Sequence, residues 1–273
     1  MHAKWIRVKK KDPCQICGRI DWCTYSNEIG LALCMRVQSE RLSKNSMGGW
    51  LHKIGEGYLR PYIAPRRLAI ESPPLDLTGM WKRWLARTEF RHLDGFAMSL
   101  GVEVESLKDM GCARADGAWA FPMKNAKREI IGIRLRNEEG QKWAVKGSKQ
   151  GLFIPEFYNS QTMLYIVEGP TDAAAAHSLG LYAIGRPSCT GCEDTITQFI
   201  SIEHIKRAVI VSDSDRPGLR GAEKLQRTLP VFSAIWVPPC KDLREFLIAG
   251  GNSQMIEATL KDTVWTPAAR RAA

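Results

Sequence analysis

The sequence predicts an α/β protein in which a parallel sheet carries helices on both faces. A small α+β lobe and an N-terminal cysteine-rich β-hairpin head precede this sheet. From residue 163 onward apolar strands alternate with helical stretches, which is typical of parallel sheets covered by helices. Residues 113–162 instead alternate apolar and polar side chains, as antiparallel strands do. Four of the eight cysteines fall within the first 34 residues and mark off the head.

The composition along the chain divides it into five segments. Four prolines between positions 60 and 77 indicate a linker, and residues 80–110 then place apolar side chains at the helical spacing of three and four. The predicted segments are a zinc-binding head at 1–57, a linker and helical segment at 58–112, a basic β-rich lobe at 113–162, an α/β domain at 163–262 and a disordered tail at 263–273.

Within the α/β domain, each element can be read from its pattern. Apolar runs rich in β-branched and aromatic residues predict the strands, and amphipathic stretches between them predict the helices. We expect strands at 163–168, 181–185, 207–213 and 232–237, and helices at 171–180, 193–202, 218–229 and 242–250.

The net charge of +10 is concentrated toward the N-terminus. Residues 1–70 hold 13 lysines and arginines against five acidic residues, a net of +8, whereas residues 161–273 hold 12 of each. Such asymmetry predicts a polyanion partner, and we expect nucleic acid. No run of 18 apolar residues predicts a membrane helix, and the N-terminus has no apolar signal region, so we expect a cytoplasmic protein with no membrane partner.

The head carries a metal-ligand pattern. Cys14 and Cys17 form a Cys-x2-Cys turn, in which two thiolates can bind one tetrahedral ion. The next segment alternates as a hairpin with a turn at 27–30, which would set Cys23 opposite Cys34 on one face. We therefore predict a structural zinc site of four cysteines. Two alternatives stay open: His52 could replace Cys23, or the head could be metal-free with buried thiols.

Four carboxylates stand where predicted strands end. Glu168 closes one strand with Asp172 at the start of the next helix, and Asp213 and Asp215 close another strand. The carboxyl ends of parallel strands lie along one edge, where open α/β sheets place their sites. Carboxylates gathered around one point need a hard cation such as Mg²⁺, which completes its shell with phosphate oxygens. Asp172 could instead serve only the helix start, and the aspartate pair could be turn residues.

These residues resemble a known family. "EGPTDAAAA" and "SDSDRPGLRGAEKL" resemble the Glu-Gly and Asp-x-Asp motifs of Toprim domains, and "CKDLREFLIAGG" resembles the stretch that closes the Toprim domain of bacterial primases. With the zinc head in front, the chain looks like a DnaG-type DNA primase in a short phage or mobile-element form. The cysteine spacing of the head and the short region before the Toprim motifs depart from the usual primase pattern.

The resemblance implies roles for these residues. Glu168, Asp213 and Asp215 would bind the catalytic Mg²⁺ or Mn²⁺, while Asp172 and Asp242 are second-rank acidic candidates. Primases hold the template on a basic ridge before the Toprim domain, and residues 124–149 hold eight lysines and arginines against three glutamates. The ridge residues that we predict to bind nucleic acid are Arg134, Arg136, Lys146 and Lys149.

The predicted function is therefore a DNA primase that makes short RNA primers on single-stranded DNA by Mg²⁺-dependent nucleotidyl transfer. Its partners would be the DNA template, NTPs and a separate replicative helicase, because the sequence contains no Gly-x4-Gly-Lys-Ser/Thr motif. Two alternatives remain: a non-catalytic zinc and Toprim mediator of replication or recombination that binds DNA, and a Toprim nuclease.

Overall fold

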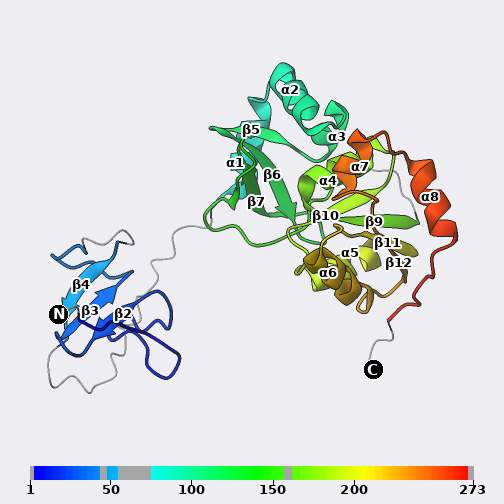
Figure 1. The fold of residues 1–273 in the computed structure, drawn as a ribbon. Helices are drawn as coiled ribbons and strands as arrows, with labels where there is room; N and C mark the ends of the chain where they lie inside the picture. Colours follow the sequence, from blue (N-terminus) through cyan, green and yellow to red (C-terminus); the bar gives the residue numbers. More distant parts are fainter. Residues whose placement is uncertain (1–2, 44–47, 55–74, 157–161, 270–273) are drawn as a thin grey trace. The chain divides into compact units, whose positions relative to one another are not determined.

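The protein forms two separate units, at Met1–Pro74 and Leu75–Ala273. The computed structural model describes residues 3–43, 48–54, 75–156 and 162–269, which Figure 1 shows as coloured ribbon. Most of the proline-rich linker predicted between positions 60 and 77 lies outside the described residues, which resume at residue 75. The predicted parallel sheet, small α+β lobe and β-hairpin head are all confirmed. The five predicted segment boundaries remain a prediction.

The first unit is a four-stranded antiparallel sheet. Its strands, in spatial order, are β1 (Ile6–Arg7), β2 (Thr24–Ser26), β3 (Leu31–Cys34) and β4 (Trp50–Lys53). The predicted hairpin is confirmed, because β2 pairs with β3 in the register that sets Thr24 opposite Leu33. Continuing this register by one residue sets Cys23 opposite Cys34, and both side chains are fully buried. The core beneath the sheet is small, so a metal would contribute much of its stability.

The second unit opens with three helices followed by an antiparallel sheet. The helices are α1 (Leu77–Ala86), α2 (Phe90–Leu100) and α3 (Val104–Asp109), and they confirm the predicted helical stretch. The sheet has the order β5 (Ala113–Ala115), β6 (Ala118–Lys124), β7 (Ile130–Arg136) and β8 (Lys142–Ala144). Phe96 of α2 stacks on Trp119 of β6 with ring centroids 4.4 Å apart, which holds α2 against the sheet.

The parallel sheet of the second unit has the spatial order β10-β9-β11-β12. Its strands are β9 (Met163–Glu168), β10 (Ala183–Arg186), β11 (Arg207–Val211) and β12 (Phe232–Trp236), and all three pairings are parallel. Because β9 lies between β10 and β11, the chain winds in opposite directions from β9 and from β11. A crevice at the carboxyl ends of these two strands is where α/β folds of this type place ligands.

Helices cover both faces of the parallel sheet, as Figure 1 shows. Alternate residues of β9 point to opposite faces, so Tyr165 and Val167 pack in one core and Leu164 and Ile166 in the other. The first core contains α4 (Gly169–Ser178), α7 (Leu243–Ile248) and α8 (Ser253–Lys261), and the second contains α5 (Glu193–Ile202) and α6 (Arg216–Gln226). The three-layer arrangement therefore follows from the strand pattern.

A short segment connects the two sheets of the second unit. Leu152 pairs with Lys124 of β6, and the next residue, Phe153, pairs with Gly185 of β10. The core on this side contains Phe121 from the antiparallel sheet together with Val167 from the parallel sheet. The two sheets therefore share one continuous interior.

Two features at the C-terminal end differ from the sequence prediction. Helix α8 is absent from the predicted elements, although Asn252 caps it by accepting a hydrogen bond from the Met255 amide at 3.0 Å. The predicted disordered tail is ordered as far as residue 269. Thr266 pairs with Ser233, and the guanidinium of Arg207 lies 4.1 Å from the centroid of a Trp265 ring. In the described parts of the chain, no helix has the length and apolar character needed to span a membrane.

Candidate functional site

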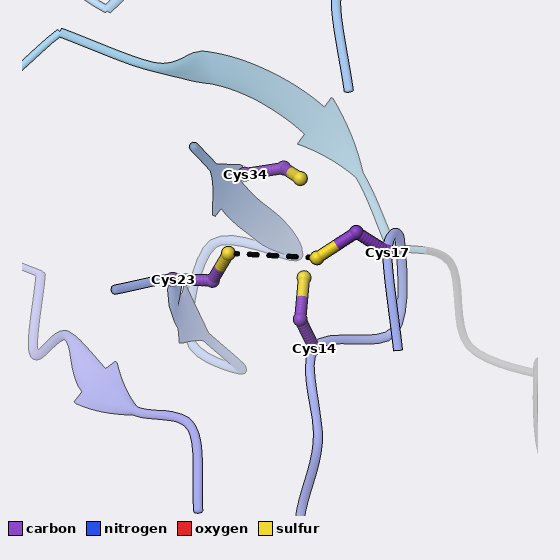
Figure 2. Close-up of side chains that lie close together, drawn as sticks. All are labelled: Cys14, Cys17, Cys23 and Cys34. Atoms are coloured by element: carbon purple, nitrogen blue, oxygen red, sulfur yellow. Dashed lines mark hydrogen bonds between the residues drawn. The ribbon is translucent and has the colours of Figure 1, made fainter. Parts of the chain in front are cut away.

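The four predicted zinc ligands come together in the head. Cys14 and Cys17 lie on the loop before the hairpin, while Cys23 and Cys34 face each other at its open end (Figure 2). Their Sγ atoms all lie within 4.8 Å of one another, and those of Cys17 and Cys23 are 3.7 Å apart. Two sulfurs on a tetrahedral zinc at about 2.3 Å would stand about 3.8 Å apart. The cluster therefore fits a four-cysteine zinc site.

Neighbouring groups suit thiolates rather than neutral thiols. The Met35 amide donates to the sulfur of Cys23 at 3.5 Å, and the Val37 amide donates to that of Cys34 at 3.3 Å. Burial raises the pKa of Cys14 and of Cys23, so a cation is needed to keep these sulfurs ionised at neutral pH. His52, the alternative ligand, instead places Nε2 3.0 Å from the carbonyl oxygen of Val37. The structure thus assembles the all-cysteine set.

The second candidate site is an acidic edge at the carboxyl ends of β9 and β11. Glu168 is the last residue of β9, and Asp213 follows β11. Burial raises the pKa of Glu168, and the negative charge of Asp213 raises it further. Burial likewise raises the pKa of Asp213, with Asp242 and Asp215 adding to the effect. These mutual effects indicate that Glu168 and Asp213 lie within electrostatic reach of each other at the edge where the two strands end.

Asp172 belongs to the same acidic edge and is not a helix cap. It lies in the first turn of α4, and its buried Oδ1 has no hydrogen-bond partner among the described residues. Burial raises its pKa to about 7, with further contributions from the negative charges of Asp242 and Asp213. An unpartnered buried carboxylate oxygen is an unusual feature that a bound cation would satisfy.

Asp215 and Asp242, by contrast, both cap helices. Asp215 accepts a hydrogen bond from the Gly218 amide at 2.7 Å at the start of α6, and Asp242 accepts one from the Glu245 amide at 2.8 Å at the start of α7. Among the described residues, no three carboxylates have oxygens within 4.8 Å of one another. The acidic edge is therefore a set of converging carboxylates that suits a hydrated Mg²⁺ or Mn²⁺, which keeps several waters.

Cationic side chains lie next to the acidic edge. Arg136 of β7 is the register partner of Lys142 of β8. Desolvation lowers the pKa of Arg136, and the positive charge of Arg244 lowers it further. The positive charges of Lys142 and Arg244 in turn offset part of the rise in the pKa of Asp172. Positive charge from the antiparallel sheet and from α7 thus reaches the carboxylates at the end of β9.

A basic pocket continues from this cationic group. Its volume is about 490 Å³, and the residues with basic or acidic side chains that line it are Arg91, His92, Arg114, Arg136, Glu138 and Arg244. Arg114 pairs with Glu138 at 3.2 Å and lies over the ring of Trp119 at 4.9 Å. Four guanidinium groups around one pocket suit phosphate oxygens, which arginine can bind through two parallel hydrogen bonds.

Comparisons with known proteins agree with this architecture. No protein-family model matches the chain. The catalytic domain of a DnaG primase bound to single-stranded DNA superposes with a TM-score of 0.55 at 13% identity, over 69% of this chain and 77% of its own. The chain has the fold of a DnaG-type primase core.

Two further proteins extend the comparison. An Aquifex aeolicus primase, with zinc-binding and RNA polymerase domains, superposes with a TM-score of 0.54 at 13% identity, over 69% of this chain and 59% of its own. The DNA helicase/primase of Enterobacteria phage T3 is 20% identical in an alignment of 173 positions that covers 57% of this chain. The chain spans about 30% of the length of that curated relative. At these identities the likeness lies in the fold.

The four residues predicted to bind nucleic acid lie in two different places in the structure. Arg134 and Arg136 lie on one face of β7, as the alternation predicted, and both carry positive charge next to Lys142. Lys146 and Lys149 are exposed in the segment after β8. Neither contributes to the charge interactions found for the acidic edge in the described residues. The roles of all four in nucleic-acid binding remain predictions.

Three site residues were not singled out from the sequence. Lys142 is set beside Arg136 by the β7–β8 register, which the turn at 137–140 could have revealed. Arg244 lies in α7, where the family resemblance pointed to Asp242 alone. Arg186 ends β10 directly beside Glu168 and is 1% exposed. Its signal was an arginine that follows the apolar strand "LYAIG", one residue past the predicted strand end.

Proposed function

We propose that this protein is a DNA primase, which synthesises short RNA primers on single-stranded DNA by Mg²⁺-dependent nucleotidyl transfer. One observation carries the proposal: in a DnaG-type fold, the carboxylates of Asp172 and Asp213, with Glu168 beside Asp213, lie within electrostatic reach of the cationic group of Arg136, Lys142 and Arg244. Transfer of a nucleotidyl group needs this combination of opposite charges, because divalent cations and basic side chains together neutralise a triphosphate.

The side chains would divide the work between binding and positioning. The acidic edge would hold Mg²⁺ or Mn²⁺, which supplies charge neutralisation at the reacting phosphate and activates the attacking 3'-hydroxyl. Arg136, Lys142 and Arg244 would hold phosphate oxygens, and the basic pocket beside them would take further phosphates of the template or nucleotide. Because these groups come from β7, β8 and α7, the fold itself positions them.

The head would contribute contact with the template. Residues 1–70, which contain the head, carry a net charge of +8, and in the head Trp22 is 62% exposed with the Arg7 guanidinium 5.8 Å from the centroid of its ring. Exposed aromatic rings and cations are the groups on which single-stranded bases and phosphates bind. Zn²⁺ would hold this surface in shape. A separate replicative helicase would open the duplex.

Primer synthesis from labelled NTPs on a single-stranded DNA template tests the proposal. Template-dependent RNA product that disappears in Asp213→Asn is the expected result, and parallel reactions with dNTPs identify the nucleotide used. DNA cleavage in Mg²⁺ or Mn²⁺ without nucleotides would identify a nuclease instead. Metal-independent DNA binding with no nucleotide consumed would identify a non-catalytic mediator.

A further inference from the structure

One cation of the acidic edge belongs to the protein itself. Arg186 is 1% exposed, and its Nη2 lies 3.4 Å from Oε1 of Glu168. The pair is built into the sheet, because Arg186 and Glu168 are register partners on the parallel strands β10 and β9. Register partners project from the same face, so the strand pairing alone brings the two side chains together.

The guanidinium has little freedom to leave this position. Its Nη1 lies 3.5 Å from the carbonyl oxygen of Gly221 in α6, and the surrounding wall is tightly packed. A Cβ added at Gly221 would come within 2.2 Å of the backbone oxygen of Cys189, so helix α6 and the segment after β10 are already in close contact. Arg186 is therefore clamped between β9, β10 and α6.

Its burial decides what Arg186 can do. A side chain with 1% exposure cannot reach out to bind a phosphate from solvent, unlike the arginines of the basic pocket. Its charge must be balanced locally, because an unpaired buried charge is strongly unfavourable. Among the described residues, Glu168 is the only acidic side chain that forms an ion pair with Arg186. The two residues thus form a nearly neutral unit at the end of β9.

We propose that Arg186 is a positioning residue that neutralises Glu168 and thereby assigns the divalent cation to Asp213 and the aspartates beside it. The proposal rests on the proposed function, in which this edge binds Mg²⁺ or Mn²⁺. It gives Glu168 a different role from the aspartates: its carboxylate is oriented by a fixed guanidinium and borders the ion site. Asp172, with an unpartnered buried oxygen, is better placed to bind the ion.

A double-mutant cycle tests this assignment. The EPR signal of free Mn²⁺ measures the binding of Mn²⁺ to the full zinc-loaded chain of each variant. Glu168→Gln alone removes a negative charge and should weaken Mn²⁺ binding about 10-fold, while Arg186→Met alone should strengthen it by a similar factor. The double variant R186M/E168Q removes a neutral unit. Its Mn²⁺ affinity should therefore return to within about 3-fold of the wild-type value, given ordinary non-additivity between neighbours.

The double variant decides the question. If Glu168 binds the ion directly, R186M/E168Q will be as weak as E168Q, and the proposal is overturned. This variant leaves no uncompensated buried charge, so it should fold at least as well as either single variant. Arg186→Lys keeps the charge and should bind Mn²⁺ as the wild type does, whereas D213N should lose binding in every background. Because no template or nucleotide is present, failure of primer synthesis would leave the result of this cycle unaffected.

Discussion

Asp213 and Asp215 stand two residues apart after β11, yet their carboxylates have different partners. Asp215 accepts a hydrogen bond from the Gly218 amide at 2.7 Å and so caps α6. Burial is the main cause of the raised pKa of Asp213, and the negative charge of nearby Asp242 is the second. The Asp-x-Asp pattern therefore combines one aspartate that stabilises a helix with one whose negative charge is only partly balanced, by Lys241 and Lys142.

This difference predicts opposite effects on stability. Asp215→Ala should lower the free energy of unfolding by about 1 kcal/mol through loss of the cap, while Asp215→Asn should keep it, because asparagine caps equally well. Asp213→Asn should leave stability unchanged or higher, since it removes repulsion from Asp242. Urea denaturation in Mg²⁺-free buffer measures all three. Destabilisation of D213N to the level of D215A would contradict the assignment.

Zinc content should depend on Cys23 and not on His52. We expect one zinc per chain, released as thiol groups are modified, and loss of that zinc in Cys23→Ser together with unfolding of the head. His52→Ala serves as the matched control and should retain full zinc content, because its ring lies against Val37 instead. Colorimetric zinc release and elemental analysis of the purified variants measure the outcome. Zinc loss in H52A with retention in C23S would establish the alternative ligand set.

The raised pKa of Asp172, about 7, predicts a specific pH dependence of stability. Because the folded state keeps this proton where the unfolded chain has lost it, stability should fall as pH rises from about 4 to 7. Asp172→Asn does not titrate, so its free energy of unfolding should exceed that of the wild type by an amount that grows across that window, to the order of 4 kcal/mol. Denaturation of both proteins in Mg²⁺-free buffer at several pH values measures the difference. A difference that does not change with pH would show that Asp172 is ionised throughout.

The cationic group predicts how DNA binding depends on salt. If Arg136 and Lys142 each contact a phosphate, removing one should lower the slope of log K against log salt by about 0.7, the value for single strands. Fluorescence polarisation with a labelled oligonucleotide measures this slope. Lys261→Ala, an exposed lysine on α8, serves as a control and should leave it unchanged. Equal slopes for R136A and wild type would remove Arg136 from the interface.

Much of the fold was predictable because its strands carry strong local patterns. The run "MLYIVE" predicts β9 with its bounds as observed, and "EDTITQFISI" predicts α5 equally well. Helix α8 was not predicted, because its apolar residues are few and its main signal is the capping Asn252. The order of the tail was not predicted either, because Trp265 is held by a cation–π contact with Arg207, more than 50 residues away in sequence.

Site residues were predictable as neighbours where one motif contains both, or where both stand at the carboxyl ends of parallel strands, as Glu168 and Asp213 do. The pairing of Cys23 with Cys34 follows from a single hairpin, whereas Arg186 meets Glu168 only through the strand order β10-β9. That order is a property of the folded sheet and leaves no trace in local spacing. Likewise, Arg244 reaches Asp172 because α7 packs beside α4, which no periodicity in either helix reveals.

The short link through Leu152 and Phe153 sets a limit on how this chain can be divided. Phe153 covers the open edge of β10 by pairing with Gly185, so a fragment beginning at residue 163 would expose that edge. Uncovered strand edges invite pairing between molecules, and such a fragment should self-associate. The sequence motifs of the α/β domain begin at β9, but the smallest soluble module that contains them begins upstream, within the antiparallel lobe.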